Sequence, residues 1–348
     1  MLVDVGKIRA GVLNMFKVNL GLRPGERILV LTDIPRPGDW AGMGLDKLFD
    51  MVKRAFLARA VAQIAREEFP NCQVEFYAYP ATGMSGLEPP PGVGDRMKSA
   101  DVVVAITTYS LSHTRAREEA TRAGARVASM PGFLEEMFYP DGPMAADYRA
   151  IKELSEELAE LLTRAEEARV ITPAGTDMEF SLRGREGLAD TGMLTRRGSW
   201  GNLPAGEAFI APVEGTARGR MVVQAGWHPG LEEDMTLVVR DGEVVEILGG
   251  GAVGDRLRDR LRPGVDEEPY RSRRNIAELG IGTNPFARRP DVVLEAEKIK
   301  GTVHIAVGSN KFIGGLVETD LHIDFVLPEP DLYVDGEAII RHGEFLLG

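Results

Sequence analysis

The segment Arg27-Ile28-Leu29-Val30-Leu31-Thr32 decides how the first half of the chain is interpreted. It is a short apolar run that follows the turn-forming Pro24-Gly25, which is typical of a buried β-strand. Similar strand-like segments recur at 73–78, 101–106 and 126–130, and helical spacing of apolar residues is found at 8–20, 45–69 and 114–123. Repeated β-α-β units of this kind predict an α/β domain with a Rossmann-like parallel sheet.

Such a sheet suggests a nucleotide site, but the sequence does not support one. The strand at 27–32 continues into Asp33-Ile34-Pro35, not into a Gly-x-Gly-x-x-Gly turn that opens a helix. A Gly-x-x-x-x-Gly-Lys-Ser/Thr loop is absent from the sequence. We interpret Gly249-Gly250-Gly251 as a turn after a hairpin.

The pattern changes after a charged, amphipathic helical segment at 145–168. Segments 169–172, 177–182 and 235–239 are typical of antiparallel strands, and Asp241-Gly242 predicts a tight hairpin leading into 243–248. Helices are expected at 253–261 and 290–300. We therefore place a domain boundary near 166–170 and predict a Rossmann-like domain at 1–168, followed by a strand-rich α+β metal-binding domain at 169–348.

Composition limits the classes of function. The 348 residues carry a formal net charge of −12, which argues against a nucleic-acid or anionic-membrane surface as the main partner. Cys72 is the only cysteine, so the chain has no intrachain disulfide and no cysteine zinc cage. The sequence shows neither an apolar signal region nor an apolar run of the ~20 residues that a membrane span needs. We expect a cytoplasmic protein.

The segment 319–327, Thr-Asp-Leu-His-Ile-Asp-Phe-Val-Leu, holds the clearest candidate for chemistry. His322 and Asp324 lie two residues apart in an apolar, β-branched segment, so on a strand they project from one face. Burying both without partners costs several kcal/mol. Taken alone, the pair fits a metal chelate, and it equally fits a structural His–Asp pair.

Three further metal-competent residues lie in apolar, glycine-flanked segments of the second half. Glu207 opens a strand after Pro204-Ala205-Gly206, Glu278 stands in a glycine-rich context, and His304 lies within a strand. Each also has an ordinary interpretation, as a solvated carboxylate, a capping carboxylate and a core histidine respectively. Jointly with His322 and Asp324 they match the oxygen and nitrogen donors of a divalent-metal hydrolase. We predict that the other histidines, His113, His228 and His342, lie in turns or at the surface.

Four ordered motifs resemble the metallo-aminopeptidases of the aminopeptidase T and aminopeptidase S family. They are Asn-Leu-Pro-Ala-Gly-Glu at 202–207, Ala-Glu-Leu-Gly-Ile-Gly-Thr-Asn-Pro at 277–285, Gly-Thr-Val-His-Ile-Ala-Val-Gly at 301–308 and His-Ile-Asp at 322–324. The resemblance implies a hydrolase that removes N-terminal residues from peptides by means of two divalent ions (Zn, Co or Mn). The implied ligands are Glu207, Glu278, His304, His322 and Asp324.

The resemblance also implies catalytic roles and an oligomeric state. Glu207 or Glu278 would take the proton of a metal-activated water and return it to the leaving amine. The family has a tyrosine shortly after the His304 motif, whereas Lys311 is the nearest counterpart here, so we assign Lys311 to oxyanion stabilisation. The partner is expected to be a peptide with a free N-terminus, and the family implies a homodimer, for which the hairpin at 332–346 offers an interface.

A competing resemblance is to the dihydroxypyridine ring-cleaving dioxygenases, which share a His-x-Asp end motif and the overall length. That family implies one non-haem iron in a triad of two histidines and one carboxylate, with a histidine at the position of Glu278. Because Glu207, Glu278 and His304 match the hydrolase, we expect an aminopeptidase. A third alternative is a relative that has kept the fold and lost turnover.

Overall fold

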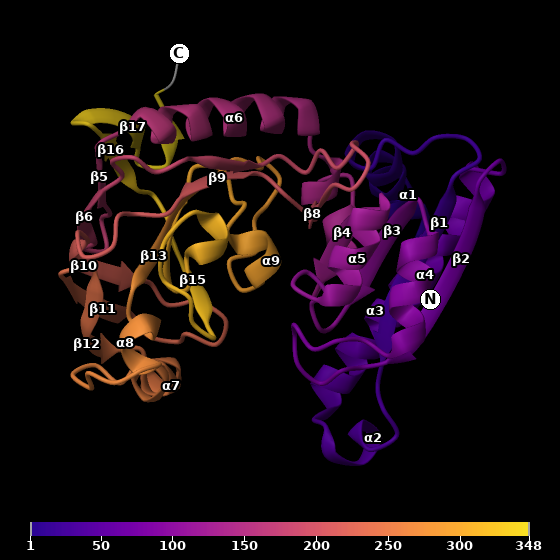
Figure 1. The fold of residues 1–348 in the computed structure, drawn as a ribbon, viewed down its shortest axis with the longest axis horizontal. Helices are drawn as coiled ribbons and strands as arrows, with labels where there is room; N and C mark the ends of the chain where they lie inside the picture. The colour runs from indigo at the N-terminus through magenta and orange to yellow at the C-terminus, as the bar shows by residue number, and fades with distance from the viewer. Residues whose placement is uncertain (1, 347–348) are drawn as a thin grey trace. The chain divides into compact units, whose positions relative to one another are not determined.

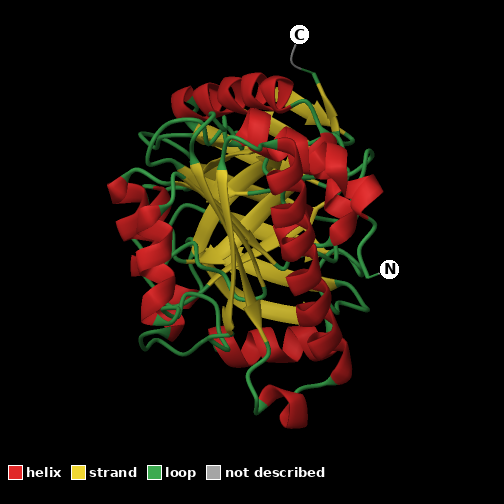
Figure 2. Ribbon diagram, turned by 90° about the vertical axis from the view of Figure 1, so that its right-hand side faces the viewer, coloured by secondary structure: helices red, strands yellow, loops and turns green. Residues whose placement is uncertain are grey.

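The structure is a computed structural model that describes residues 2–346 of the 348-residue chain. It divides into two compact units. Unit 1 consists of residues 1–148 and 192–205, and unit 2 of residues 149–191 and 206–348. Figure 1 follows the chain through its elements, and Figure 2 shows the mixture of helices and strands that makes this a mixed α/β protein.

Unit 1 is built on a five-stranded sheet in which every pairing is parallel. Its order is β2-β1-β3-β4-β8. The strands are β1 Arg27–Ile34, β2 Gln73–Pro80, β3 Val102–Thr107, β4 Arg126–Pro131 and β8 Trp200–Asn202. All six residues of β3 are buried, as expected for a strand that is covered on both faces. The prediction of a parallel α/β sheet is confirmed.

Helices accompany the parallel sheet. They are α1 Val5–Asn14, α2 Asp39–Gly42, α3 Leu45–Glu68, α4 Pro91–Ser99 and α5 Arg115–Ala123, with short η1 Met15–Asn19, η2 Glu135–Phe138 and η3 Pro143–Ala145. Val93 and Met97 of α4 pack with Ala120 of α5 against Val103 and Val127 of the sheet. Helix α3 contacts β1, β2 and β3, and helices α4 and α5 also contact strands of the sheet.

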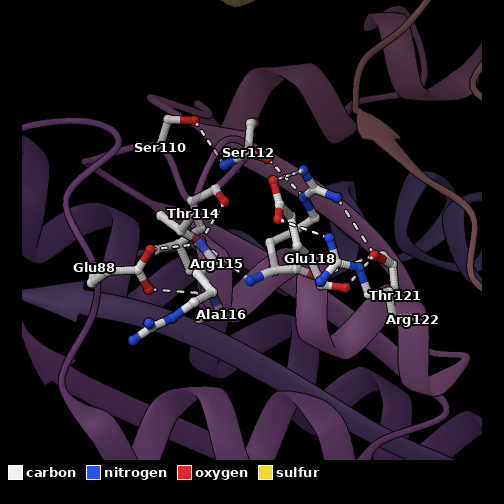
Figure 3. A network of polar contacts seen from close by, with 11 residues as sticks. Glu88, Ser110, Ser112, Thr114, Arg115, Ala116, Glu118, Thr121 and Arg122 are labelled. Atoms are coloured by element: carbon white, nitrogen blue, oxygen red, sulfur yellow. Dashed lines mark hydrogen bonds and ion pairs between the residues drawn. The ribbon is translucent and has the colours of Figure 1, made fainter.

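The turn that leads from β3 into α5 is fixed by side chains, as Figure 3 shows. Thr114 caps the helix by accepting a hydrogen bond from the Arg117 backbone N–H at 3.2 Å. The Glu88 carboxylate accepts from the N–H groups of Arg115 and Ala116 at 2.6 and 3.2 Å. These are first-turn donors that the helix itself cannot satisfy, and a negative charge at this end also complements the helix dipole.

Unit 2 contains two antiparallel sheets. The larger has the order β12-β11-β10-β6-β5-β16-β17-β18 and the smaller the order β15-β14-β13-β9-β7. Their strands are β5 Glu167–Ile171, β6 Asp177–Ser181, β7 Leu188–Asp190, β9 Glu207–Ile210, β10 Arg218–Val223, β11 Met235–Arg240, β12 Glu243–Gly249, β13 Ile276–Gly282, β14 Val303–Gly308, β15 His322–Leu327, β16 Asp331–Val334, β17 Glu337–Arg341 and β18 Glu344–Phe345. A single cluster of buried apolar side chains draws on both sheets.

Few helices accompany these sheets. They are α6 Tyr148–Arg164, α7 Gly251–Leu261, α8 Tyr270–Arg273 and α9 Val293–Ala296, with the single turn η4 Lys311–Ile313. Leu158 and Leu162 of α6 and Leu257 of α7 are buried in the core that the sheets share. None of the helices within residues 2–346 is long and apolar enough to cross a membrane.

Two expectations differ from the structure. The boundary predicted near 166–170 does not match the observed division, because α6 packs into the core of unit 2 and residues 192–205 return to unit 1, where they supply β8. The helix predicted at 290–300 is wrong over most of its length, since only Val293–Ala296 is helical and turns follow.

Candidate metal centre

The smaller sheet of unit 2 brings the candidate ligands to one face. Glu278 lies opposite Ala306, which lies opposite Asp324, and Gly308 lies opposite His322. Gly280 pairs with His304, and Gly282 pairs with Glu207 of β9. Because side chains alternate along a strand and partners in register share a face, all five predicted ligands project from the same side of the sheet.

These side chains are in contact. Glu278 Oε1 lies 3.2 Å from His304 Nε2, and its Oε2 lies 3.4 Å from His322 Nε2. The same His322 nitrogen is 3.2 Å from Asp324 Oδ1. One donor atom each from Glu278, His322 and Asp324 lies within 4.8 Å of the others, a spacing that suits a shared cation. The structure therefore brings these three together as a metal-competent triad.

The imidazole of His322 is held in a fixed orientation. Its Nδ1 donates to the backbone oxygen of Ser309 at 2.8 Å, which leaves Nε2 facing the two carboxylates. A hydrogen bond from the far nitrogen to a carbonyl is the usual way in which proteins orient a metal-binding histidine. Phe312 adds an edge-to-face ring contact with His322, with ring centroids 5.1 Å apart.

Charge in the cluster is balanced by protons. Burial alone would lower the pKa of His322, but the charge and hydrogen bond of Asp324, with a further bond to Glu278, raise it to about 12. Burial is likewise outweighed at His304, where Glu278 and Glu207 raise the pKa to about 9. The two imidazolium groups in turn hold the pKa of Glu278 below its ordinary value despite burial. A cation that binds here would replace protons.

A second group of charges lies beside the triad and was missed by sequence reasoning. Lys298 is only 3% exposed, and its Nζ lies 2.6 Å from Glu207 Oε1 and 3.0 Å from Glu297 Oε2. Burial raises the pKa of Glu297 to about 8, so this carboxyl group keeps a proton at neutral pH and is hydrogen-bonded to Asp324. The sequence predicts a helix at 290–300, and neither Lys298 nor Glu297 is among the predicted site residues.

Glycine makes room for the cluster. A Cβ atom on Gly280 would lie 1.9 Å from His304 Nε2, so any other residue would push the imidazole away. This is the close approach that the glycine-rich segment at 277–285 suggested.

Lys311 is not brought to the cluster. It lies in η4 with its side chain 60% exposed and forms an ion pair with Glu318. The oxyanion role expected for it has no support in this placement. Glu207, by contrast, joins the cluster at its edge, with Oε2 3.5 Å from His304 Nε2.

The donor set fits a divalent cation. Two carboxylates and one imidazole are the hard and borderline ligands that Mn²⁺, Fe²⁺ and Zn²⁺ accept. Within the described residues, Glu207 Oε2 and His304 Nδ1 are buried atoms without a hydrogen-bond partner. Buried polar atoms are rarely left unpaired, so each of these two atoms is available to a group from outside the chain.

A small pocket with aromatic and proline walls borders the triad. Trp227, His228, Pro229 and Pro290 line it together with Asp324 and Glu297. Burial lowers the pKa of His228, so its ring is neutral at pH 7, and the ring lies 5.3 Å from that of Phe325. His228 was expected in a turn, and its place beside Asp324 was not foreseen. The space has a volume of only about 10 Å³, which is room for a single water molecule at most.

Similarity of the whole sequence to known proteins shows the family of this chain. A family model described as NicX, 2,5-dihydroxypyridine 5,6-dioxygenase, matches residues 15–347. The chain belongs to this family. A 2,5-dihydroxypyridine 5,6-dioxygenase from Pseudomonas putida is 27% identical over 265 residues, which cover 71% of each chain.

Solved structures show the same fold in the dioxygenase family and beyond it. The 2,5-dihydroxypyridine dioxygenase from Pseudomonas putida KT2440 superposes with a TM-score of 0.72 at 19% identity, over 99% of both chains. AmpT from Thermus thermophilus superposes with a TM-score of 0.63 at 17% identity, over 99% of this chain and all of that one. The fold is therefore shared with an aminopeptidase, as the resemblance predicted.

The predicted activity is wrong. Membership of the dioxygenase family contradicts the aminopeptidase, its classification as a hydrolase or metalloprotease, and the peptide partner. The error came from giving decisive weight to Glu207, Glu278 and His304. These are three positions, whereas the similarity to the dioxygenase family extends over residues 15–347. A metal centre remains in keeping with the family and with the triad.

Proposed function

We propose that this protein is a metal-dependent ring-cleaving dioxygenase that acts on a dihydroxypyridine. The observation that carries the proposal is the triad of Glu278, His322 and Asp324, found in a chain of the dioxygenase family. The triad would hold one divalent ion. When bound, a redox-active ion such as Fe²⁺ supplies the Lewis-acid and electron-transfer chemistry that a reaction between an aromatic ring and O₂ requires.

Atoms balance with O₂ as the only oxidant. For a pyridine ring with hydroxyl groups at C2 and C5, cleavage breaks the C5–C6 bond and adds one oxygen atom to each carbon. C5, which already bears oxygen, becomes a carboxyl group, and C6 becomes a formyl group on the ring nitrogen. The four electrons that reduce O₂ come from the ring, so no external reductant is consumed.

The chain's own residues would bind, orient and deprotonate the substrate. Glu207 Oε2 is a buried acceptor without a partner among the described residues, so it is placed to take the proton of a ring hydroxyl. His304 lies between Glu207 and Glu278, and its imidazolium, whose pKa is raised to about 9 by these carboxylates, stabilises their negative charge. Trp227, His228 and Pro229 line the narrow space at Asp324 and are the side chains that would contact the ring.

Oxygen uptake tests the proposal. Protein loaded anaerobically with Fe²⁺ is mixed with 2,5-dihydroxypyridine and air-saturated buffer, while an oxygen electrode and the ring absorbance are followed together. We expect equimolar loss of O₂ and of the ring, and no loss after chelation. An absence of oxygen uptake with Fe²⁺, Mn²⁺ and Co²⁺ in turn would overturn the proposal.

A further inference from the structure

Three acidic side chains converge on the ammonium group of Lys298. Its Nζ lies 2.6 Å from Glu207 Oε1, 3.0 Å from Glu297 Oε2 and 4.0 Å from Asp190 Oδ2. The lysine is 3% exposed, and its carboxylate partner Glu207 is 7% exposed. Convergent acidic side chains are the usual surroundings of a metal ion, but here a monovalent side-chain cation lies among them.

Glu207 connects this ammonium group to the metal-competent triad. One of its oxygens binds Lys298, and the other faces His304 Nε2 at 3.5 Å, while His304 contacts Glu278 of the triad at 3.2 Å. A bridging carboxylate of this kind joins the two ions of a two-metal site, which stand about 3.5–4 Å apart. In this chain, Oε1 of Glu207 already binds the ammonium group of Lys298.

The main chain holds Lys298 in this position. Its N–H donates to the Glu295 carbonyl at 3.0 Å, and its own carbonyl accepts from the Asn284 N–H at 2.8 Å. Asn284 and Ile299 also form a β-bridge. The backbone of Lys298 is therefore held by hydrogen bonds at both its N–H and its carbonyl group. This places the side chain where its ammonium group meets the acidic side chains.

We propose that the Lys298 ammonium occupies the position of a second cation, so that the site accepts a single divalent ion at Glu278, His322 and Asp324. An added divalent ion on Glu207 Oε1 would meet the ammonium group at close range in a buried setting, where like charges repel strongly. Lys298 thereby neutralises Glu207, the carboxylate that the implied two-metal hydrolase would share between its two ions. This inference rests on the metal centre of the proposed function, but not on the oxygenation reaction.

Metal counting tests it. Metal-free wild type, Lys298→Ala and Lys298→Gln are titrated with Mn²⁺, and bound metal is measured by elemental analysis and by electron paramagnetic resonance. We expect one ion per chain and an isolated-ion spectrum for wild type. Removing the ammonium group should open a second position, with up to two ions and a spin-coupled spectrum. Lys298→Gln keeps a hydrogen-bond donor for Glu207 and Glu297, so it guards against loss of folding in the alanine variant.

Lys300→Met is the matched control, because this nearby lysine is exposed and should leave the count at one. Two ions in wild type, or one ion in both folded Lys298 variants, would overturn the inference. The outcome is independent of turnover. A wild type that binds one ion and consumes no oxygen would refute the proposed function alone.

Discussion

Asp324 contributes both charge and geometry to the metal centre. Its Oδ1 lies 3.2 Å from His322 Nε2, and its carboxylate is also hydrogen-bonded to the side chain of Glu297. Its neighbour two residues away, His322, is aimed by Ser309, so the strand presents a prearranged pair of donors. Glu278 of the adjacent strand completes the set.

We expect Asp324→Ala to lower metal affinity and the rate of oxygen uptake by at least about a hundredfold, because one of three metal donors is lost. Even the mutation of a residue that only hydrogen-bonds to a metal ligand lowers metal affinity or activity by about 10–100-fold. Titration calorimetry with Mn²⁺ and the oxygen electrode measure the two quantities. Lys311→Met serves as control, because Lys311 is exposed and paired with Glu318. Equal losses in both variants would show that the triad is misassigned.

Acid should weaken the ion pair between Asp320 and Arg273. The hydrogen bond from Arg273 lowers the pKa of Asp320 from 3.8 to about 2. When folding lowers the pKa of a carboxyl group, that group stabilises the protein fully at pH values above its unfolded-state pKa. The stabilisation is lost as the pH falls through the folded-state pKa. The Asp320 side chain is 61% exposed, so we expect at most about 1 kcal/mol.

The measurement compares wild type with Asp320→Asn in urea unfolding at pH 7 and at successively lower pH. The gap between their midpoints should shrink between about pH 4 and pH 2. A gap that widened in acid would mean that the carboxyl group is not stabilised as an anion.

At the scale of the element, β13 depends on the absence of a side chain at Gly280. The β-carbon introduced by Gly280→Ala would lie 1.9 Å from His304 Nε2, in a fully buried strand. We expect a destabilisation of about 1–3 kcal/mol and weaker metal binding, because the imidazole must move. Denaturant midpoints and Mn²⁺ titration measure both effects.

Gly92→Ala is the matched substitution. It lies in α4, where an added methyl group meets no atom within 4 Å, so stability should stay equal or rise by about 0.5–1 kcal/mol. If Gly280→Ala were as stable as wild type and bound Mn²⁺ normally, the packing of His304 against β13 would be refuted.

Elements with strong local patterns could be predicted, and those set by tertiary contacts could not. The apolar run at 27–32 and its later counterparts became β1 to β4, because an apolar strand can be buried only within a covered sheet. β8 is three residues long and gains its pairing only from β4, so no local signal marks it. At 290–300 the predicted helix is limited to Val293–Ala296, and Lys298 is buried among acidic side chains that come from other segments.

The site shows the same division between local and long-range information. His322 and Asp324 could be placed on one face from their spacing alone. Their contact with Glu278 follows from register between strands, which a single sequence does not reveal. Lys298 and Glu297 read as ordinary surface charges until the fold buries them.

For the whole molecule, one fold supports two reactions. Similarity to AmpT and to a dihydroxypyridine dioxygenase extends over nearly the entire chain in both cases. Short motifs around the ligands are therefore insufficient to choose between them, because function depends on the site and not on the fold. The family match over residues 15–347 favours oxygenation, and the proposed role of the Lys298 ammonium group would exclude a second ion.

Isotope labelling of the product tests the central claim most directly. Fe²⁺-loaded protein is given 2,5-dihydroxypyridine under ¹⁸O₂, and the product is analysed at once by mass spectrometry. We predict a ring-opened product that carries both atoms of one O₂ molecule, one on each carbon of the broken bond. A control in labelled water first excludes exchange of the product oxygens with solvent. A product with no label or with a single labelled oxygen would then contradict a ring-cleaving dioxygenase, and so would an unchanged substrate.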